Sequence, residues 1–169
     1  MLWLESSLND LYNSTVVAFP KTTKRQYAID PIKITQLQWI PFLGMKTLFV
    51  KGMAKNENRE YGPVIVLKRV LYHESQNAGI VPLKASDGKT YFLEKLSNEN
   101  TDVLVRCNCN DFAWRFSYYN HLDKSLQGPK RKKYEALHNP GSANPAQSPG
   151  LCKHLIKLNK ILQETSIFN

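Results

Sequence analysis

The sequence predicts an α+β fold, in which an antiparallel β-meander or small barrel precedes a C-terminal module made of a strand, a turn and a helix. Short β-rich runs separated by polar turns occupy residues 46–109. Leucines recur at helical spacing after Gly150. The three cysteines connect the two patterns, because two follow the last β-rich run and the third precedes the leucines.

Residues 1–45 are expected to form an N-terminal helix and an irregular segment. The helix is indicated by apolar side chains at helical spacing: Leu4, Leu8, Leu11 and Tyr12. Pro20 and the polar run after it end this pattern. A helix this short is marginal alone in water, so its apolar side must dock on its own domain or on a neighbouring subunit. The sequence does not decide whether residues 30–35 form a helix or a strand. An Asp-Pro pair suits a helix start, whereas the β-branched residues after it favour a strand.

Residues 46–102 are expected to form an antiparallel β-domain. Its short β-rich runs, together with the first run of the next segment, are 47–50, 64–67, 70–72, 81–83, 91–93 and 103–105. Residues 86–89, Ser-Asp-Gly-Lys, indicate a tight hairpin turn because Asp-Gly tolerates positive φ. Alternating side chains and short turns imply antiparallel pairing.

Residues 103–169 are expected to form the C-terminal module, with a long insert at 120–150. The insert is irregular, because it combines a basic run at 130–133 with a stretch rich in proline, glycine and asparagine. The clearest helix of the chain follows the insert, where an apolar stripe is formed by Leu151, Leu155, Leu158 and Leu162. Three lysines share another face of that helix: Lys153, Lys157 and Lys160.

The motif with the clearest chemistry consists of Cys107, Cys109, Cys152 and His154. Its pattern is C-x-C, then 42 residues (110–151), then C-x-H, and it uses every cysteine of the chain. Four donors of this kind form the shell that closes around a structural Zn²⁺ in tetrahedral geometry. Residues two apart point to nearly opposite sides of a helix, so Cys152 must precede the helical backbone if this pair binds one ion. An odd number of cysteines fits a disulfide framework badly and a reduced compartment well.

The sequence around these ligands resembles the SWIM family of zinc fingers over residues 103–160. The run C-N-C-N-D-F at 107–112 is similar to the family's C-x-C-x-D-F pattern, and L-C-K-H-L at 151–155 is similar to its C-K-H-hydrophobic pattern. The resemblance implies a zinc-binding set with two side chains packed behind it: Cys107, Cys109, Cys152 and His154, with Phe112 and Leu155. It also implies a module that binds nucleic acid or protein and has no catalysis of its own.

The spacer between the two ligand pairs is longer than in many members of that family, and it carries the basic run. Its Asn-Pro and Pro-Gly-Leu-Cys-Lys-His-Leu segments are also similar to small proteins of tailed bacteriophages. This second resemblance implies an alternative function, as a structural component of a large assembly such as a phage virion (a capsid, neck or tail accessory protein). The partners would then be protein subunits.

The chain is basic, with 23 Lys and Arg against 14 Asp and Glu and a formal net charge of +9. One zinc with three thiolates lowers this to about +8. The excess indicates an acidic partner such as nucleic acid, or it serves solubility. The candidate contacts to nucleic acid or another acidic partner, each of which could equally be solvated, are Lys130, Arg131, Lys132, Lys133, Lys153, Lys157 and Lys160.

Aromatic residues between 112 and 119 allow two interpretations. Phe112, Trp114, Phe116 and Tyr118 alternate and could stack on bases. They also fit a core around the metal, and Phe112, Phe116 and Tyr119 would share one helix face. We favour the core.

Several function classes find no support in the sequence. It has no nucleophile elbow, phosphate-binding glycine loop or acidic cluster for Mg²⁺, and four ligands leave a zinc ion no open position. We therefore expect no enzyme, no catalytic residue and no small-molecule substrate. Neither a long apolar run nor a signal-peptide pattern occurs, so we expect no membrane partner. The expected location is the cytoplasm, or a virion if the protein is phage-encoded.

Overall fold

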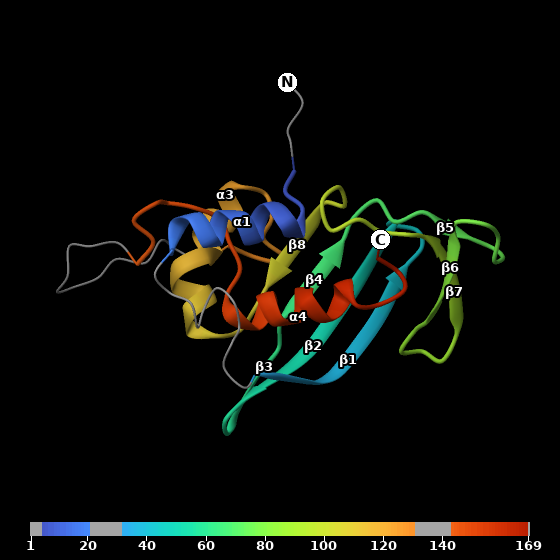
Figure 1. Cartoon of the computed structure of the whole chain (residues 1–169), viewed down its shortest axis with the longest axis horizontal. Helices are drawn as coiled ribbons and strands as arrows, with labels where there is room; N and C mark the ends of the chain where they lie inside the picture. Colours follow the sequence, from blue (N-terminus) through green and yellow to red (C-terminus); the bar gives the residue numbers. More distant parts are fainter. Residues whose placement is uncertain (1–4, 21–31, 131–142, 169) are drawn as a thin grey trace.

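The computed structural model describes residues 5–20, 32–130 and 143–168. The fold is α+β, as the sequence predicts. It contains a larger antiparallel sheet, a smaller three-stranded sheet beside it, and helices α1 and α4 over one face of the larger sheet (Figure 1). Both sheets are open, so the barrel alternative is not realised.

The larger sheet has five strands, all paired antiparallel, in the order β1-β2-β4-β8 with β3 beside β2. The strands are β1 (Lys33–Phe42), β2 (Thr47–Asn56), β3 (Arg59–Tyr61), β4 (Val64–Leu67) and β8 (Val103–Arg106). β1 resolves the ambiguity at residues 33–35 in favour of a strand; Ile32 precedes the strand, and 30 and 31 lie outside the described residues. The three segments proposed from the sequence, residues 1–45, 46–102 and 103–169, each contribute at least one strand to this sheet.

The smaller sheet contains β5 (Tyr72–His73), β6 (Ile80–Lys84) and β7 (Thr90–Glu94), in the order β5-β7-β6. The hairpin turn predicted at 86–89 joins β6 to β7. Gly88 has φ 83°, and the Ala85 N–H donates to the Lys89 carbonyl at 2.9 Å. Positive φ at this turn explains why an Asp-Gly pair stands there.

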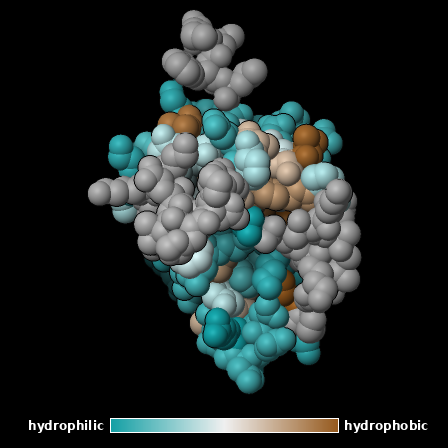
Figure 2. All heavy atoms as spheres, turned by 90° about the vertical axis from the view of Figure 1, so that its left-hand side faces the viewer, coloured by the Kyte–Doolittle hydropathy of each residue, from teal (hydrophilic) through white to brown (hydrophobic). Residues whose placement is uncertain are grey.

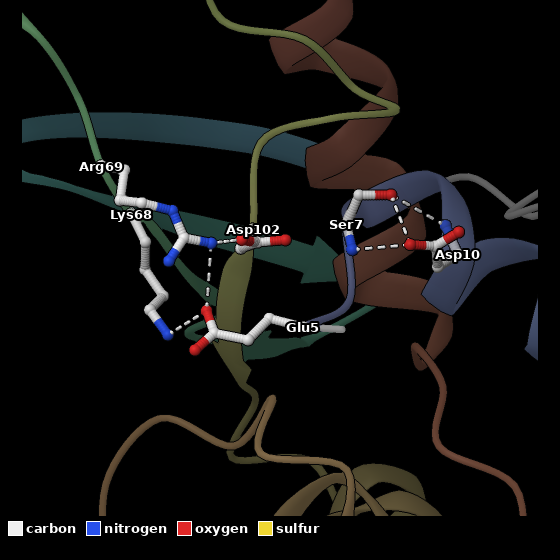
Figure 3. Close-up of polar contacts among 6 residues, drawn as sticks. All are labelled: Glu5, Ser7, Asp10, Lys68, Arg69 and Asp102. Carbon is white, nitrogen blue, oxygen red and sulfur yellow. Dashed lines mark hydrogen bonds and ion pairs between the residues drawn. The ribbon is translucent and has the colours of Figure 1, made fainter. Parts of the chain in front are cut away.

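Helix α1 (Leu8–Ala18) docks on its own domain. Ser7 and Asp10 form a capping box at its start, in which each side chain bonds the other residue's backbone N–H (Figure 3). Leu8 and Leu11 are 1% and 0% exposed and belong to the main core. Burial of these two side chains answers the question of where the helix docks, while Leu4 of the predicted stripe lies outside the described residues.

An ion-pair cluster fastens the chain just before α1. Glu5 accepts a hydrogen bond from Lys68 Nζ at 2.6 Å and from Arg69 at 3.3 Å, and Arg69 also pairs with Asp102 (Figure 3). The hydrogen bond from Lys68 is the main reason why the pKa of Glu5 lies below its ordinary value. A lowered pKa means that this contribution to stability is present above the carboxyl's unfolded pKa and is lost as the pH falls through the folded value.

The remaining helices complete the core. The π-helical segment η1 (Phe112–Phe116) runs into α3 (Ser117–Leu122), and α4 (Lys153–Gln163) follows the insert. Phe112, Phe116 and Tyr119 are buried while Trp114 is exposed, which confirms the core interpretation for the first three. The predicted leucine stripe of α4 is also confirmed, because all four members are fully buried: Leu151, Leu155, Leu158 and Leu162.

Candidate metal centre

Cys107, Cys109, Cys152 and His154 meet at one point between β8 and α4. Their four ligand atoms all lie within 4.8 Å of one another, and all four residues are buried. The two cysteines of the first pair follow the end of β8, and the second pair flanks the start of α4. This cluster could hold a metal ion, as the motif predicts.

The backbone at the start of α4 allows Cys152 and His154, two residues apart in the chain, to face the same point. Cys152 is the N-cap of the helix, with φ −73° and ψ 168°, and its backbone is therefore extended. His154 lies in the first helical turn. Because the chain turns between them, both side chains reach the same point, which confirms the expectation that Cys152 precedes the helical backbone.

The distances between ligand atoms fit a tetrahedral ion. His154 Nδ1 lies 3.8 Å from Cys107 Sγ and 4.0 Å from Cys152 Sγ. Zinc–sulfur bonds of about 2.3 Å and zinc–nitrogen bonds of about 2.0 Å give tetrahedral edges of about 3.6 Å between nitrogen and sulfur. Nδ1 is thus the ligand nitrogen. Nε2 is buried and has no hydrogen-bond partner among the described residues.

The three thiols of the cluster differ in how readily each loses its proton. Hydrogen bonds from Cys107 and Cys152 lower the pKa of Cys109, so this sulfur carries negative charge most readily. The hydrogen bond with Cys109 raises the pKa of Cys107, and burial raises the pKa of Cys152. Three thiolates therefore coexist in this buried space only if a positive ion joins them.

Backbone and packing contacts hold the first ligand pair. The Phe112 N–H donates to Cys109 Sγ at 3.3 Å, a contact that stabilises a thiolate. The side chains of Phe112 and Leu155, expected to pack behind the metal, are buried in the same core cluster as the cysteines. The metal centre is therefore continuous with the hydrophobic core.

The β3–β4 region covers the centre with two contacts that the sequence analysis missed. The ring of Tyr61 stacks on the ring of His154, with centroids 4.3 Å apart and an interplanar angle of 28°. The Gly62 N–H donates to Asn108 Oδ1 at 2.9 Å, between the two cysteines of the first pair. No local signal marks these residues, because the contacts join positions at least 46 apart in the chain.

The segment before Cys152 is held by a polar bridge. Asn120 is buried, donates to the Gly150 carbonyl at 2.9 Å and accepts from the Gly150 N–H at 2.8 Å. The Leu151 N–H donates to Thr15 Oγ1 at 2.9 Å. A Cβ at Gly150 would lie 2.4 Å from Thr15 Oγ1 and 2.7 Å from the Phe116 ring. Only glycine leaves room for these neighbours. Gly150, which precedes α4, is thus the point where the chain contacts both α1 and α3.

The structure places the basic candidates in two groups. Lys153 and Lys157 are half-buried and Lys160 is exposed on α4, the helix that carries His154. Lys130 is exposed at the edge of the insert, and Arg131, Lys132 and Lys133 lie outside the described residues. Lys153 thus stands between Cys152 and His154 in the chain, and Lys157 and Lys160 follow farther along the same helix.

No protein-family model, curated protein or solved structure matches this chain. The SWIM resemblance therefore stays a prediction from the motif and its spacing. Within the described part of the chain, no helix is long and apolar enough to cross a membrane.

Proposed function

We propose that this protein is a non-enzymatic binding module whose C-terminal part folds around one structural zinc ion in the manner of a SWIM finger. The observation that carries the proposal is the buried convergence of four ligand atoms within 4.8 Å. Three thiolates and one imidazole favour zinc over magnesium or calcium, which prefer oxygen ligands. Because the three cysteines belong to the hydrophobic core, we expect the protein to lose stability when no metal ion joins them.

The closed ligand set supports a structural role for the ion. Catalytic zinc sites usually have three protein ligands and keep a fourth position for water or substrate. Here four buried side chains offer one ligand atom each, and together they would complete a tetrahedral shell around an ion. Substrate would have to displace a ligand from the core to reach the ion.

The proposed partner is nucleic acid, supported by the net charge of +9 and by the lysines on α4. Lys153, Lys157 and Lys160 recur at helical spacing on α4, the helix that carries His154. A row of ammonium groups on one side of a helix suits contact with phosphates. The metal would then act by fixing the orientation of this helix.

Elemental analysis and a binding titration test the proposal. Protein purified without chelator should contain about one zinc per chain, because one tetrahedral site is present. Labelled single- and double-stranded DNA, titrated at two salt concentrations, should show affinity that falls as salt rises. Folded protein with less than about a tenth of a zinc ion per chain would refute the structural role.

An exposed apolar tip favours a second candidate function, as a subunit of a larger assembly built from copies of this chain. Three large side chains near the β1–β2 turn are exposed, namely Phe42 (42%), Leu43 (51%) and Met45 (72%). Leu71, 48% exposed, lies close by, since the Val70 N–H donates to the Lys46 carbonyl. Figure 2 shows the other end of the molecule, where hydrophobic areas also appear on a largely hydrophilic surface. The exposed large apolar side chains of α1, η1 and α3 are Val17, Trp114 and Leu122.

Replacing Leu43 and Met45 by serine tests this candidate. If the tip joins copies of the chain, wild-type protein should show a mass by light scattering that grows with concentration, and the double variant should stay monomeric. Both substitutions are at exposed positions of a turn, so the stability of the monomer should change by less than about 0.5 kcal/mol each. A wild-type protein that remains monomeric throughout would contradict self-assembly through this tip.

A further inference from the structure

The larger sheet has an outer face that points away from α1 and α4. Side chains alternate along each strand, so even-numbered residues of β2 such as Leu48, Val50 and Ala54 enter the main core. Odd-numbered residues of β2 therefore project on the other side. In Figure 1 both helices lie in front of the sheet, so this outer face is on the far side of the view.

An apolar row crosses the outer face over four strands. Ile40 pairs with Phe49, Phe49 with Val66, and Val66 with Leu104. None of these four side chains belongs to the main core cluster of the described residues, although Val66 is only 2% exposed. Phe42 extends the row, with its ring 5.0 Å from that of Phe49 in an edge-to-face arrangement. The row thus offers an aromatic surface to a ligand outside the core.

Polar side chains lie beside this row on β1 and β2. Gln38 pairs with Lys51, Gln36 with Met53, and Lys33 with Lys55. A shallow hollow of about 100 Å³ is lined by Gln36, Gln38, Lys51, Gly52 and Met53. The face therefore combines aromatic rings, amides that can hydrogen-bond, and ammonium groups.

The charged side chains of this sheet are almost all positive. Strands β1, β2, β4 and β8 contain no Asp or Glu, and Glu60 of β3, opposite Lys55, is the single carboxylate of the five strands. Lys33 and Lys55 lie directly opposite each other, an arrangement of like charges that destabilises a sheet. Lys33, Lys51 and Lys55 are exposed, and no ion pair within the described part of the chain neutralises them.

A fourth cation on the outer face, Arg106, already has a structural use. Its guanidinium donates to the carbonyls of Gln127 and Pro129 and holds that segment beside β8. The three lysines are thus the groups available to a ligand. In the pairing register Lys55 has a carboxylate opposite it, that of Glu60, whereas the strand partners of Lys33 and Lys51 carry none.

We propose that the outer face of the β1-β2-β4-β8 sheet binds single-stranded nucleic acid. Bases stack on Phe42 and Phe49, phosphates contact Lys33, Lys51 and Lys55, and the two glutamines hydrogen-bond to base edges. Charge favours a polyanion over a protein partner, and exposed aromatic rings favour unpaired bases over a duplex whose bases are already stacked. The inference rests on the proposed nucleic-acid function and assigns it a strand type and a second surface in addition to the α4 lysines.

The test is fluorescence polarisation with a labelled oligothymidylate of about 16 nucleotides, a length within the usual site size. A Lys33→Ala, Lys51→Ala, Lys55→Ala variant should bind at least tenfold more weakly at low salt. Its slope of log affinity against log salt should shrink by about 2, since each single-strand contact contributes about 0.7. Phe42→Ala should weaken binding about 5- to 100-fold at an unchanged slope, because it removes stacking and no charge.

The matched control replaces Lys84, Lys89 and Lys95 by alanine, which removes the same charge from exposed positions in and next to the smaller sheet. This variant should keep at least a third of the wild-type affinity for the single strand. Zinc content and thermal unfolding, measured on every variant, separate failure of this inference from failure of the metal centre. Three results would overturn the inference: unchanged affinity of the sheet variant, a larger loss in the control variant, or tighter binding of a duplex of equal length.

Discussion

Removing zinc from the loaded protein should unfold the C-terminal module and leave much of the β-domain structured. Structural zinc in finger peptides contributes an apparent 10–16 kcal/mol, so we expect chelation to lower the free energy of unfolding by roughly 3 kcal/mol or more. The reason is the position of the ligands, because the cysteines belong to the same core cluster as Phe112 and Leu155. Amide hydrogen exchange should accelerate most at residues 103–130 and 143–160, less at 47–67, which pair with β8 or pack against α4, and least in the smaller sheet at 72–94.

A pair of histidine variants provides the control for this prediction. His154→Ala removes a buried ligand and should reproduce the effect of the chelator on exchange and on unfolding. His121→Ala makes the same chemical change at an exposed position outside the centre and should alter stability by less than about 0.5 kcal/mol. Equal stability of the two variants in zinc-containing buffer would show that the cluster does not stabilise the fold through a metal.

Gly150→Ala should destabilise the zinc-loaded protein by about 2–4 kcal/mol, more than most single substitutions. The new Cβ would lie 2.4 Å from Thr15 Oγ1 and 2.7 Å from the Phe116 ring, so the helices must move apart. That movement also strains the hydrogen bonds from Asn120 to Gly150 and from Leu151 to Thr15. Urea unfolding followed by circular dichroism measures the loss.

Gly44→Ala is the matched control, because nothing lies within 4 Å of a Cβ at that position and its φ is not positive. It should be neutral or slightly stabilising, by up to about 1 kcal/mol, since alanine restricts the unfolded chain. If both glycine variants unfold at the same urea concentration, the packing at Gly150 is looser than the structure indicates. A midpoint lowered for Gly150→Ala alone identifies this residue as the point where three helices meet.

Local sequence patterns were enough to predict the elements whose information lies within one turn or one hairpin. The leucine stripe of α4 repeats every three to four residues, and burial of that stripe follows from its period alone. The turn at Gly88 follows from the positive φ that Asp-Gly tolerates. The four candidate metal ligands are predictable for a related reason, since their chemistry and their spacing single them out without knowledge of the fold.

Tertiary structure alone decided the features that depend on partners distant in the chain. Residues 33–42 became β1 through pairing with β2, and that register sets which side chains form the outer face. Tyr61 and Asn120 support the metal centre from positions that carry no motif. Strand register and burial depend on contacts between residues that are distant in the chain. Helical periodicity, turn type and the kind of metal ligand can be recognised from neighbouring residues.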